Sequence, residues 1–419
     1  MLLLYTLSIR LYGLGIHLAS LFSPKARLWV DGRRDWPTKL ARFNEQFPHD
    51  QNRPRFWVHC ASLGEFEQGR TLIEAIKQES PETIIILTFF SPSGYEIRKS
   101  YGHADGIFYL PLDTAKNAQQ FLTLIQPSKV VFVKYEFWYH YLSSLKKAAI
   151  PTIVISAIFR PDQVFFRPYG AFFRKILHFF DHLFVQDQSS IDLLQSIDIH
   201  NTTKAGDTRI DRVAQIPSEG KAFPKIAAFL DEAPCLVVGS SWGPDEAILK
   251  ESIQKSLPTE WKIIIAPHDI SSTHLDSIEQ LWGVDIIRFS ALTKQPQKRC
   301  RFLLIDNIGM LQALYQYGKL AYIGGGFGSG IHNTLEPITF GLPVIFGPKY
   351  QKFEEAKQLI QAGGGFTISN AQELSDTFEL LLEPNTYQKA SSRARAYIEN
   401  NQGGTEKILG YLDLVTSKD

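Results

Sequence analysis

A chain of 419 residues is too long for one ordinary hydrophobic core, and about 150 residues per domain predicts two or three domains. Its 44 Lys and Arg residues balance 43 Asp and Glu residues, which argues against a nucleic-acid partner because such proteins carry a basic domain or stripe. The three cysteines, Cys60, Cys235 and Cys300, lie far apart, so the sequence argues against a disulfide framework or zinc site and favours a reducing cytoplasmic setting.

The N-terminal segment is apolar but carries charge. Residues 2–23 include Arg10, which would cost about 3 kcal/mol at the centre of a membrane-spanning helix, and they lack the flanks of a signal peptide. A basic cluster follows at once: Lys25, Arg27, Arg33 and Arg34. An apolar helix followed by basic residues is typical of a monotopic anchor on an anionic leaflet, and the alternative is a buried first helix. Residues 1–34 are expected to form the anchor.

Alternating strands and helices fill the rest of the chain in two stretches. Residues 55–60 and 83–88 are short apolar runs, as expected for buried parallel strands, with helical spacing between them at 68–79. The first stretch continues with strands at 106–109, 130–133, 152–156 and 182–185 and helices at 115–125 and 189–196. After a linker at 216–220, strands are expected at 235–238, 262–266, 285–288, 302–305, 320–323 and 343–346, and helices at 244–256 and 310–316. This pattern predicts two doubly wound α/β domains, residues 35–215 and 216–419, facing each other across a cleft.

Two carboxylates follow predicted strands of the first domain. Ser62 and Gly64 lie in the turn after residues 55–60, and Glu65 comes where the helix begins, so its carboxylate could take a proton from a substrate hydroxyl. The alternative is that Glu65 or Glu67 stabilises the helix N-terminus. Glu136 follows the next candidate strand among aromatic residues and is a candidate for orienting substrate or for pairing with a cation.

Turns after strands of the second domain suggest an anion site. The glycine run 324–330 could bring backbone N–H groups to a phosphate, but its spacing differs from dinucleotide-binding and Walker loops. Glu336, about one turn into the following helix, is placed to accept hydrogen bonds from ribose hydroxyls. Ser240 and Ser241 suit a phosphate or sugar carboxylate, whereas the turn at 306–311 is explained by turn chemistry as well as by function.

Residues 159–184 combine nine aromatic residues with Arg160, Arg167, Arg174 and Lys175. Such interleaving can bind single-stranded nucleic acid, but next to an N-terminal anchor it favours a surface that contacts lipid head groups. A plain aromatic core is the alternative for part of the segment.

The motifs occur in an order that resembles the 3-deoxy-D-manno-octulosonic acid (Kdo) transferase family of lipopolysaccharide synthesis. WVHCASLGE resembles the family's W-x-H-x-x-S-x-G-E, TFFSPSGYE its threonine-rich segment, YLPLDT its Y-L-P-x-D and YEFW its E-x-E-L-W. AGDTRIDRV is similar to G-N-x-K-x-D, DNIGML to D-T-M-G-E-L, and GGGFGSGIHNTLEP to G-G-S…G-G-H-N-x-L-E-P. Each motif alone is weak, but the ordered set, over about residues 55–365, is specific.

The resemblance implies a GT-B fold with two Rossmann-like domains. It implies inverting transfer of Kdo from CMP-Kdo to a lipid A precursor at the cytoplasmic face of the inner membrane, with no metal and no cofactor. Glu65 would be the general base, with Glu136 beside it. The donor would contact Ser240, Ser241, His268, Gly309, Met310, Leu311, Gly330, His332, Asn333 and Glu336, and the acceptor would contact Ser62, Gly64, Arg160 and Arg167.

The chain departs from the family pattern in three places. His268 stands where the family commonly has the arginine of A-P-R-H, and it replaces that cation only in part because imidazole is mostly neutral near pH 7. Lys349 and Arg209 are candidate substitutes. Lys134 replaces the first acid of E-x-E, and Arg160 is displaced by two positions from the arginine of N-A-R.

Other functions fit the same residues less well. One is another GT-B enzyme, either a transferase that uses a UDP-sugar or a sugar-nucleotide 2-epimerase; because an epimerase needs no anchor, deleting residues 1–24 would separate the two. The other is a non-catalytic lipid-surface protein on a degenerate transferase scaffold.

Overall fold

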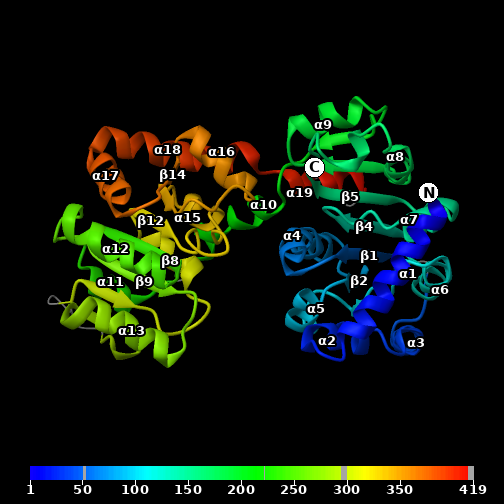
Figure 1. Cartoon of the computed structure of the whole chain (residues 1–419), viewed down its shortest axis with the longest axis horizontal. Coiled ribbons are helices and arrows are strands. Elements are labelled where there is room, and N and C mark those ends of the chain that lie inside the picture. Colours follow the sequence, from blue (N-terminus) through cyan, green and yellow to red (C-terminus); the bar gives the residue numbers. More distant parts are fainter. Residues whose placement is uncertain (51–52, 221, 294–299, 414–419) are drawn as a thin grey trace. The chain divides into compact units, whose positions relative to one another are not determined.

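The computed structural model describes residues 1–50, 53–220, 222–293 and 300–413 and divides into two compact units (Figure 1). Unit 1 comprises Met1–Asp211 and Asn401–Asp419, and unit 2 comprises Arg212–Asn400. This division falls four residues before the predicted boundary between 215 and 216.

The last helix, α19 (Gly404–Tyr411), belongs to unit 1, although the sequence placed everything from 216 to 419 in the second domain. The carboxylate of Asp211 accepts hydrogen bonds of 2.6 Å from the backbone N–H groups of Gly403 and Thr405 at the start of this helix. Ile408, Leu409 and Leu412 then bury their side chains in the core of unit 1. The helix is thus held by one cap and a small apolar face.

Unit 1 is built on a seven-stranded parallel sheet with the order β3-β2-β1-β4-β5-β6-β7. The inner strands are short apolar runs buried on both faces, which is what a parallel sheet between helical layers requires, whereas the edge strand β7 is polar and partly exposed. The order reverses direction between β1 and β4, so the crevice at their carboxyl ends is the place where open α/β sheets bind ligands. The strands are β1 (Arg55–Cys60), β2 (Ile84–Phe89), β3 (Gly106–Tyr109), β4 (Lys129–Val133), β5 (Thr152–Ala157), β6 (His182–Val185) and β7 (Thr202–Lys204).

Unit 2 repeats the plan with the order β10-β11-β9-β8-β12-β13-β14, and its direction reverses between β8 and β12. The strands are β8 (Cys235–Ser241), β9 (Lys262–Pro267), β10 (Ile286–Arg288), β11 (Phe302–Leu304), β12 (Leu320–Ile323), β13 (Val344–Phe346) and β14 (Gly365–Thr367). The prediction of two parallel α/β sheets is therefore confirmed. The sequence missed β7 and β14, because each is a three-residue edge strand with little apolar signal.

Helices connect the strands in both units (Figure 1). Those of unit 1, besides α19, are α1 (Leu2–Ala19), α2 (Pro24–Gly32), α3 (Trp36–Gln46), α4 (Leu63–Glu79), α5 (Pro92–Arg98), α6 (Ala115–Ile125), α7 (Tyr139–Lys147), α8 (Ala171–Leu177) and α9 (Gln188–Gln195), and α10 (Arg209–Val213) crosses the boundary. Those of unit 2 are α11 (Pro224–Leu230), α12 (Gly243–Ser256), α13 (Ser272–Trp282), α14 (Leu311–Leu314), α15 (Leu335–Thr339), α16 (Glu354–Ala362), α17 (Ala371–Leu382) and α18 (Pro384–Asn401).

The N-terminal segment forms two helices, which separate where Ser23 caps α2 and Pro24 begins it. Among the described residues, α1 is the one helix long and apolar enough to cross a membrane by length and composition. One face of α1 packs on unit 1, since the Tyr5 hydroxyl donates to the buried carboxylate of Asp113 at 2.5 Å and Ile9 is buried. The rest of its surface carries exposed apolar side chains: Leu3, Leu4, Leu7, Leu11, Leu14 and Leu18.

The prediction of a free basic cluster after the first helix was wrong for Arg33. Its guanidinium donates hydrogen bonds to the carbonyls of Phe90 and Leu110 and stacks 3.7 Å from the ring centroid of Trp29. Arg33 therefore ties α2 to unit 1 and is not available to a leaflet.

The aromatic segment 159–184 also differs from the lipid-facing surface that the sequence favoured. Phe159, Phe165 and Phe180 are buried in the core of unit 1, and most of the other rings pack against that core. In this segment Tyr169 is the exposed large hydrophobic residue among those described. The alternative of an aromatic core was therefore correct. The composition of the segment could not decide between the two, because it does not reveal which rings face inward.

Candidate functional site

Ser62 and Glu65 lie directly after β1, at the point where the strand order of unit 1 reverses. Helix α4 begins at Leu63, two residues before the predicted start at Glu65, so Glu65 is in its first turn, where the helix dipole favours a negative charge. Ser62 precedes the helix in extended conformation, and its hydroxyl donates to Oε2 of Glu65. Gly64 lies between them and is exposed. The Glu65 carboxylate is thus oriented by one local hydroxyl and remains partly open to solvent.

A chain of polar contacts crosses the interior of unit 1 to Glu136. The carboxylate of Glu136 accepts a hydrogen bond of 2.6 Å from Nε1 of Trp138 and lies 3.1 Å from Nε2 of the fully buried His59. Nδ1 of His59 is 2.8 Å from the hydroxyl of Thr88, which also accepts from Nε1 of Trp57. Because a carboxylate can only accept, His59 donates from Nε2 to Glu136, while the Thr88 hydroxyl accepts from the indole N–H of Trp57. This chain holds Glu136 in one orientation.

The segment after β7 lies against α4 and the end of β5. Thr208 donates to the backbone carbonyl of Gln68 at 2.7 Å and lies 3.1 Å from the hydroxyl of Ser156. Arg209, one of the candidate cations for the donor, binds Asp207 through Nε and Nη2 at 2.6–3.1 Å. This pair holds the pKa of Asp207 below its ordinary value despite burial. Arg209 is therefore engaged within unit 1.

Ser240 and Ser241 end β8, at the reversal point of unit 2. Ser240 has φ +54°, and the register with β9 shifts between Gly239 and Ser241, so the strand ends in a bulge. Backbone strain of this kind in a non-glycine residue is often found at functional sites. The Ser241 hydroxyl is buried and donates to Glu246 at 2.9 Å, so Ser240 is the more accessible of the two serines.

Asp245 joins the turn after β8 to the glycine segment. Its buried carboxylate accepts hydrogen bonds from the backbone N–H groups of Trp242 and Gly325 at 3.0 and 2.9 Å and from the Tyr322 hydroxyl at 3.0 Å. Burial raises the pKa of Asp245. The sequence did not single out this residue, although an acid in the first turn of a helix beside a bulge is the available signal.

Three aromatic rings lie together at the carboxyl ends of β8, β9 and β12. The rings of Trp242 and His268 have centroids 4.5 Å apart, and those of His268 and His332 are also 4.5 Å apart, with interplanar angles of 26° and 23°. Nε1 of Trp242 donates to Nε2 of His332 at 3.3 Å. The predicted donor residues His268 and His332 are thus brought together by a tryptophan that the sequence did not assign to the site.

Several backbone N–H groups of the glycine segment form hydrogen bonds within the turn itself. The N–H groups of Gly328 and Gly330 donate to the carbonyl of Gly325, and the N–H of His332 donates to Gly324. Glycine is required here for close packing, since a Cβ at Gly326 would lie 2.6 Å from the backbone of Gly347. These N–H groups stabilise the turn itself and are not directed at a ligand.

Lys349 contributes a side-chain cation to the glycine segment. Its ammonium donates to the carbonyl of Gly328 at 2.8 Å and is exposed. Of the two candidate substitutes for the family's arginine, Lys349 is the one that lies in unit 2 with the other predicted donor residues.

Glu336 lies in the first turn of α15, one residue after the helix begins, rather than a full turn inside it. Its Oε1 accepts a hydrogen bond of 3.0 Å from Nδ2 of Asn333, whose Oδ1 accepts from the N–H of Leu335. Asn333 thus fixes the orientation of Glu336. The carboxylate remains partly exposed, as a group that binds hydroxyls must be.

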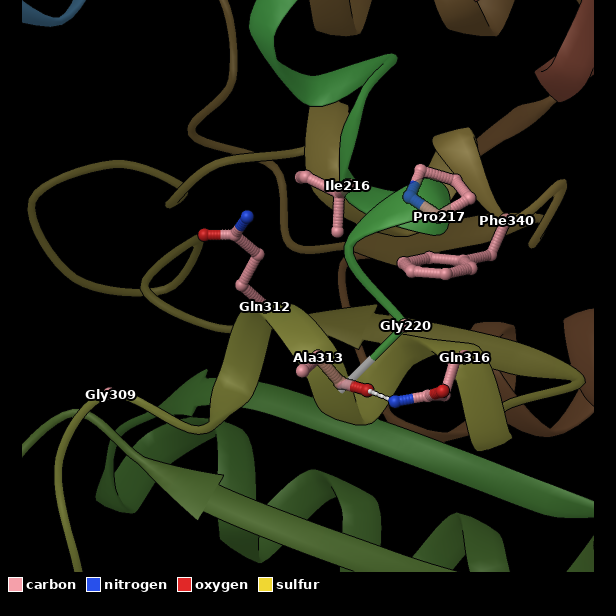
Figure 2. Close-up of a pocket in the computed structure, with 8 residues that line it drawn as sticks. All are labelled: Ile216, Pro217, Gly220, Gly309, Gln312, Ala313, Gln316 and Phe340. Atoms are coloured by element: carbon pink, nitrogen blue, oxygen red, sulfur yellow. Dashed lines mark hydrogen bonds between the residues drawn. The ribbon is translucent and has the colours of Figure 1, made fainter. Parts of the chain in front are cut away.

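Gly309 lines a pocket between the predicted linker and α14 (Figure 2). The linker itself is a short 3-10 helix of unit 2, Ile216–Glu219. The other wall comes from α14 and the residues after it, where Nε2 of Gln316 donates to the carbonyl of Ala313 at 2.6 Å. Met310 and Leu311 begin α14 beside Gly309, and Met310 is buried.

Comparisons with known proteins agree on one family. Residues 34–212 match the model of the 3-deoxy-D-manno-octulosonic-acid transferase (kdotransferase) family. A 3-deoxy-D-manno-octulosonic acid transferase of Aquifex aeolicus is 29% identical over 81% of this chain and 89% of its own length. The enzyme of the same description from Rickettsia bellii is 26% identical over 92% of this chain and 93% of its own.

The chain is similar to Kdo transferases over more than four-fifths of its length. These relatives support a glycosyltransferase and agree with the recognition drawn from the ordered motifs.

Solved structures add evidence on the fold. A glycosyltransferase from Rickettsia africae has a TM-score of 0.57 at 12% identity and covers 88% of this chain and all of its own. A UDP-GlcNAc 2-epimerase from Neisseria meningitidis has a TM-score of 0.60 at 15% identity, with 85% and 99% covered. At these identities the likeness shows the GT-B fold alone and does not favour epimerase chemistry over transfer.

The predicted acceptor residues of this protein lie in unit 1 but not all together. Ser62 and Gly64 adjoin Glu65, whereas Arg160 and Arg167 follow β5 and flank the short helix Val164–Phe166. Both arginines are exposed, and Nε of Arg167 donates to the carbonyl of Asp162 at 3.3 Å. Their role in binding remains a prediction.

Proposed function

We propose that this protein transfers Kdo from CMP-Kdo to a lipid A precursor during lipopolysaccharide core synthesis. Kdo transferases from Aquifex aeolicus and Rickettsia bellii match more than four-fifths of the chain, and the strand order of each unit reverses at a point where open α/β sheets bind ligands. Unit 1 binds the acceptor and unit 2 binds the donor.

Glu65 is the general base in this proposal, and the position of its carboxylate is the observation that supports this role. The carboxylate follows β1 at the point where the strand order reverses, is oriented by Ser62 and stays partly exposed. It takes the proton from an acceptor hydroxyl as that oxygen bonds to the anomeric carbon of Kdo, while CMP leaves with the electrons of the broken bond. Attack and departure on opposite faces of the sugar invert the anomeric configuration. Glu136, held by His59 and Trp138, orients the acceptor.

The donor is held by residues after four neighbouring strands of unit 2. Glu336, fixed by Asn333, accepts hydrogen bonds from the ribose hydroxyls, and the turn Gly309–Leu311 contacts the base. Ser240, His268, His332 and Gly330 surround the phosphate or the Kdo carboxylate. No cofactor is required for this displacement.

The protein acts on the cytoplasmic face of the inner membrane in this proposal. Tyr5 and Ile9 face unit 1 along α1, so the helix lies on the protein surface and presents its exposed leucines to the bilayer. A helix held in this way rests in the interface and does not cross it. The lipid acceptor reaches unit 1 from the same surface.

The test is incubation of the full chain with CMP-Kdo and a lipid A precursor, followed by mass spectrometry of the lipid. We expect the lipid to gain the mass of Kdo, and the Glu65→Gln variant to give almost none. A gain from a UDP-sugar and none from CMP-Kdo would overturn the donor assignment.

A further inference from the structure

The ring cluster Trp242–His268–His332 has an arrangement that distinguishes its two imidazoles. Trp242 is a hydrogen-bond donor only, so its contact with Nε2 of His332 requires that this nitrogen carry no proton. His332 is therefore neutral, with its proton on Nδ1. Half-burial and the neighbouring His268 lower the pKa of His332, which agrees with this state.

His268 differs from His332 in its exposure and in its hydrogen bonds. It is exposed, and within the described part of the chain neither of its ring nitrogens has a hydrogen-bond partner. One face of its ring lies against the indole of Trp242, and an aromatic face attracts a cation. Of the two imidazoles, His268 is the one that can accept a proton without breaking a contact.

The charged groups around the cluster each have a hydrogen-bond partner. The carboxylate of Asp269, next along the chain, accepts from the N–H and hydroxyl of Ser271. From the other elements come Asp245 (bound to the N–H groups of Trp242 and Gly325), Glu246 (bound to Ser241 and His274), Lys349 (bound to the carbonyl of Gly328) and Glu336 (bound to Asn333). The N–H groups of Gly328, Gly330 and His332 are also used within the turn, so an anion at the cluster does not bind these three groups.

We propose that the phosphodiester of the sugar nucleotide binds this cluster together with one proton taken from solvent, which is held on His268, while neutral His332 donates from Nδ1. The inference rests on the proposed function, because it takes the donor to be a cytidine monophosphate ester. Donor affinity then falls as the pH rises, because binding of the phosphodiester takes up a proton.

The methyl ester of CMP is the probe, because its phosphodiester keeps one negative charge at every pH used and does not itself bind protons. It is titrated calorimetrically into the full-length protein at about pH 7.5, one unit above the ordinary imidazole pKa, in buffers of different ionisation enthalpy. The dependence of the heat on buffer gives the number of protons taken up. We expect uptake approaching one proton per bound ester, and none with cytidine, which lacks the phosphate.

Two substitutions identify the group that takes the proton. His268→Arg is charged throughout, so we expect it to bind the ester without proton uptake and with affinity independent of pH. His268→Gln is expected to bind roughly tenfold more weakly, also without uptake. His200→Arg changes an exposed imidazole of unit 1 in the same way and serves as the matched control, with uptake as in the wild type.

Each outcome separates the two proposals. Binding of the ester with heats that do not depend on buffer, or uptake that persists in His268→Arg, overturns the protonated His268 and leaves the donor assignment intact. No binding of the ester or of CMP to the wild-type protein overturns the proposed donor and this inference with it.

Discussion

Nε2 of His59 lies 3.1 Å from Oε2 of Glu136, deep in unit 1, although the two residues are 77 positions apart in the chain. His59 is in β1 and Glu136 follows β4, and these strands are neighbours where the sheet order reverses. The indole N–H of Trp138 occupies the same carboxylate oxygen. Glu136 is thus held by two donors and is better suited to positioning a substrate than to exchanging its proton.

Removal of this carboxylate is expected to destabilise the fold. Glu136→Ala leaves Nε2 of the fully buried His59 without its acceptor, which costs about 2 kcal/mol of unfolding free energy. Glu136→Gln keeps one acceptor oxygen, so its loss should be smaller. Urea unfolding followed by circular dichroism measures both, with Glu82→Ala as a control at a carboxylate that is 79% exposed. Equal losses in all three variants would show that the His59 contact does not contribute.

The general base is tested by comparing two acids of the same helix. Glu65→Gln removes the proton acceptor but keeps an oxygen for the Ser62 hydroxyl, so turnover should fall by about 10³ with CMP affinity unchanged. Glu67→Gln is the matched control, because Glu67 pairs with Arg98 at 2.7 Å, and it should retain most of the activity. Initial rates of Kdo transfer and calorimetry with CMP give the two readouts. A large rate loss in both variants would mean that the helix start, rather than Glu65, is required.

The raised pKa of Asp245 makes the stability of unit 2 depend on pH, and one substitution can remove this dependence. Burial raises this pKa above its ordinary 3.8, so the folded protein binds the proton more tightly than the unfolded chain does. The contribution of this group to stability is therefore fully present below about pH 4 and is lost as the pH rises through the raised pKa. Asp245→Asn does not titrate and can still accept from Trp242 and Gly325 through its single oxygen.

The measurement is the unfolding free energy of both proteins between about pH 4 and pH 8. The other carboxylates contribute equally to the two proteins, so the stability of Asp245→Asn relative to the wild type should increase with pH. A difference that stays constant across this range would contradict a raised pKa. Asp245→Ala, which leaves two N–H groups and the Tyr322 hydroxyl without an acceptor, should be destabilised at every pH.

The fold was predictable because buried parallel strands appear in the sequence as continuous apolar runs, and residues at their carboxyl ends meet at one edge of the sheet. Glu65 and Glu136 could be placed at that edge in this way. The chain of contacts behind Glu136 could not, since Trp57, Thr88 and His59 are buried side chains whose contacts depend on which strands are neighbours. The local sequence does not reveal the order of the strands in the sheet.

The glycine segment and the aromatic segment show a second limit. A glycine run permits close backbone approach, but whether the neighbour is a phosphate or another strand, as at Gly326 and Gly347, depends on tertiary packing. Likewise the rings of 159–184 suit a lipid surface or a core equally well by composition. The contact of Trp242 with His332, across 90 positions, required the structure for the same reason.

The two faces of α1 should respond differently to substitution. Exchange of Leu7, Leu11, Leu14 and Leu18 for Gln removes exposed apolar side chains without touching unit 1. Because each leucine buried in a bilayer contributes on the order of 2 kcal/mol, binding to anionic vesicles should fall more than tenfold while the Tm stays unchanged. Leu380→Gln, at an exposed leucine of unit 2, is the matched control and should bind as the wild type does.

Tyr5→Phe tests the opposite face of α1. This change removes the hydroxyl that donates to Asp113, whose carboxylate also accepts from the N–H groups of His140 and Tyr141 at the start of α7. A buried hydrogen bond to a carboxylate contributes about 2 kcal/mol, so the Tm should fall while the exposed leucines are intact. Sedimentation of the Tyr5→Phe variant with vesicles then reports whether α1 must be packed on unit 1 for the protein to bind the bilayer.

The four-leucine variant decides whether α1 is the membrane-binding face. If it sediments with vesicles as well as the wild type does, α1 does not contact the bilayer and the membrane face lies elsewhere.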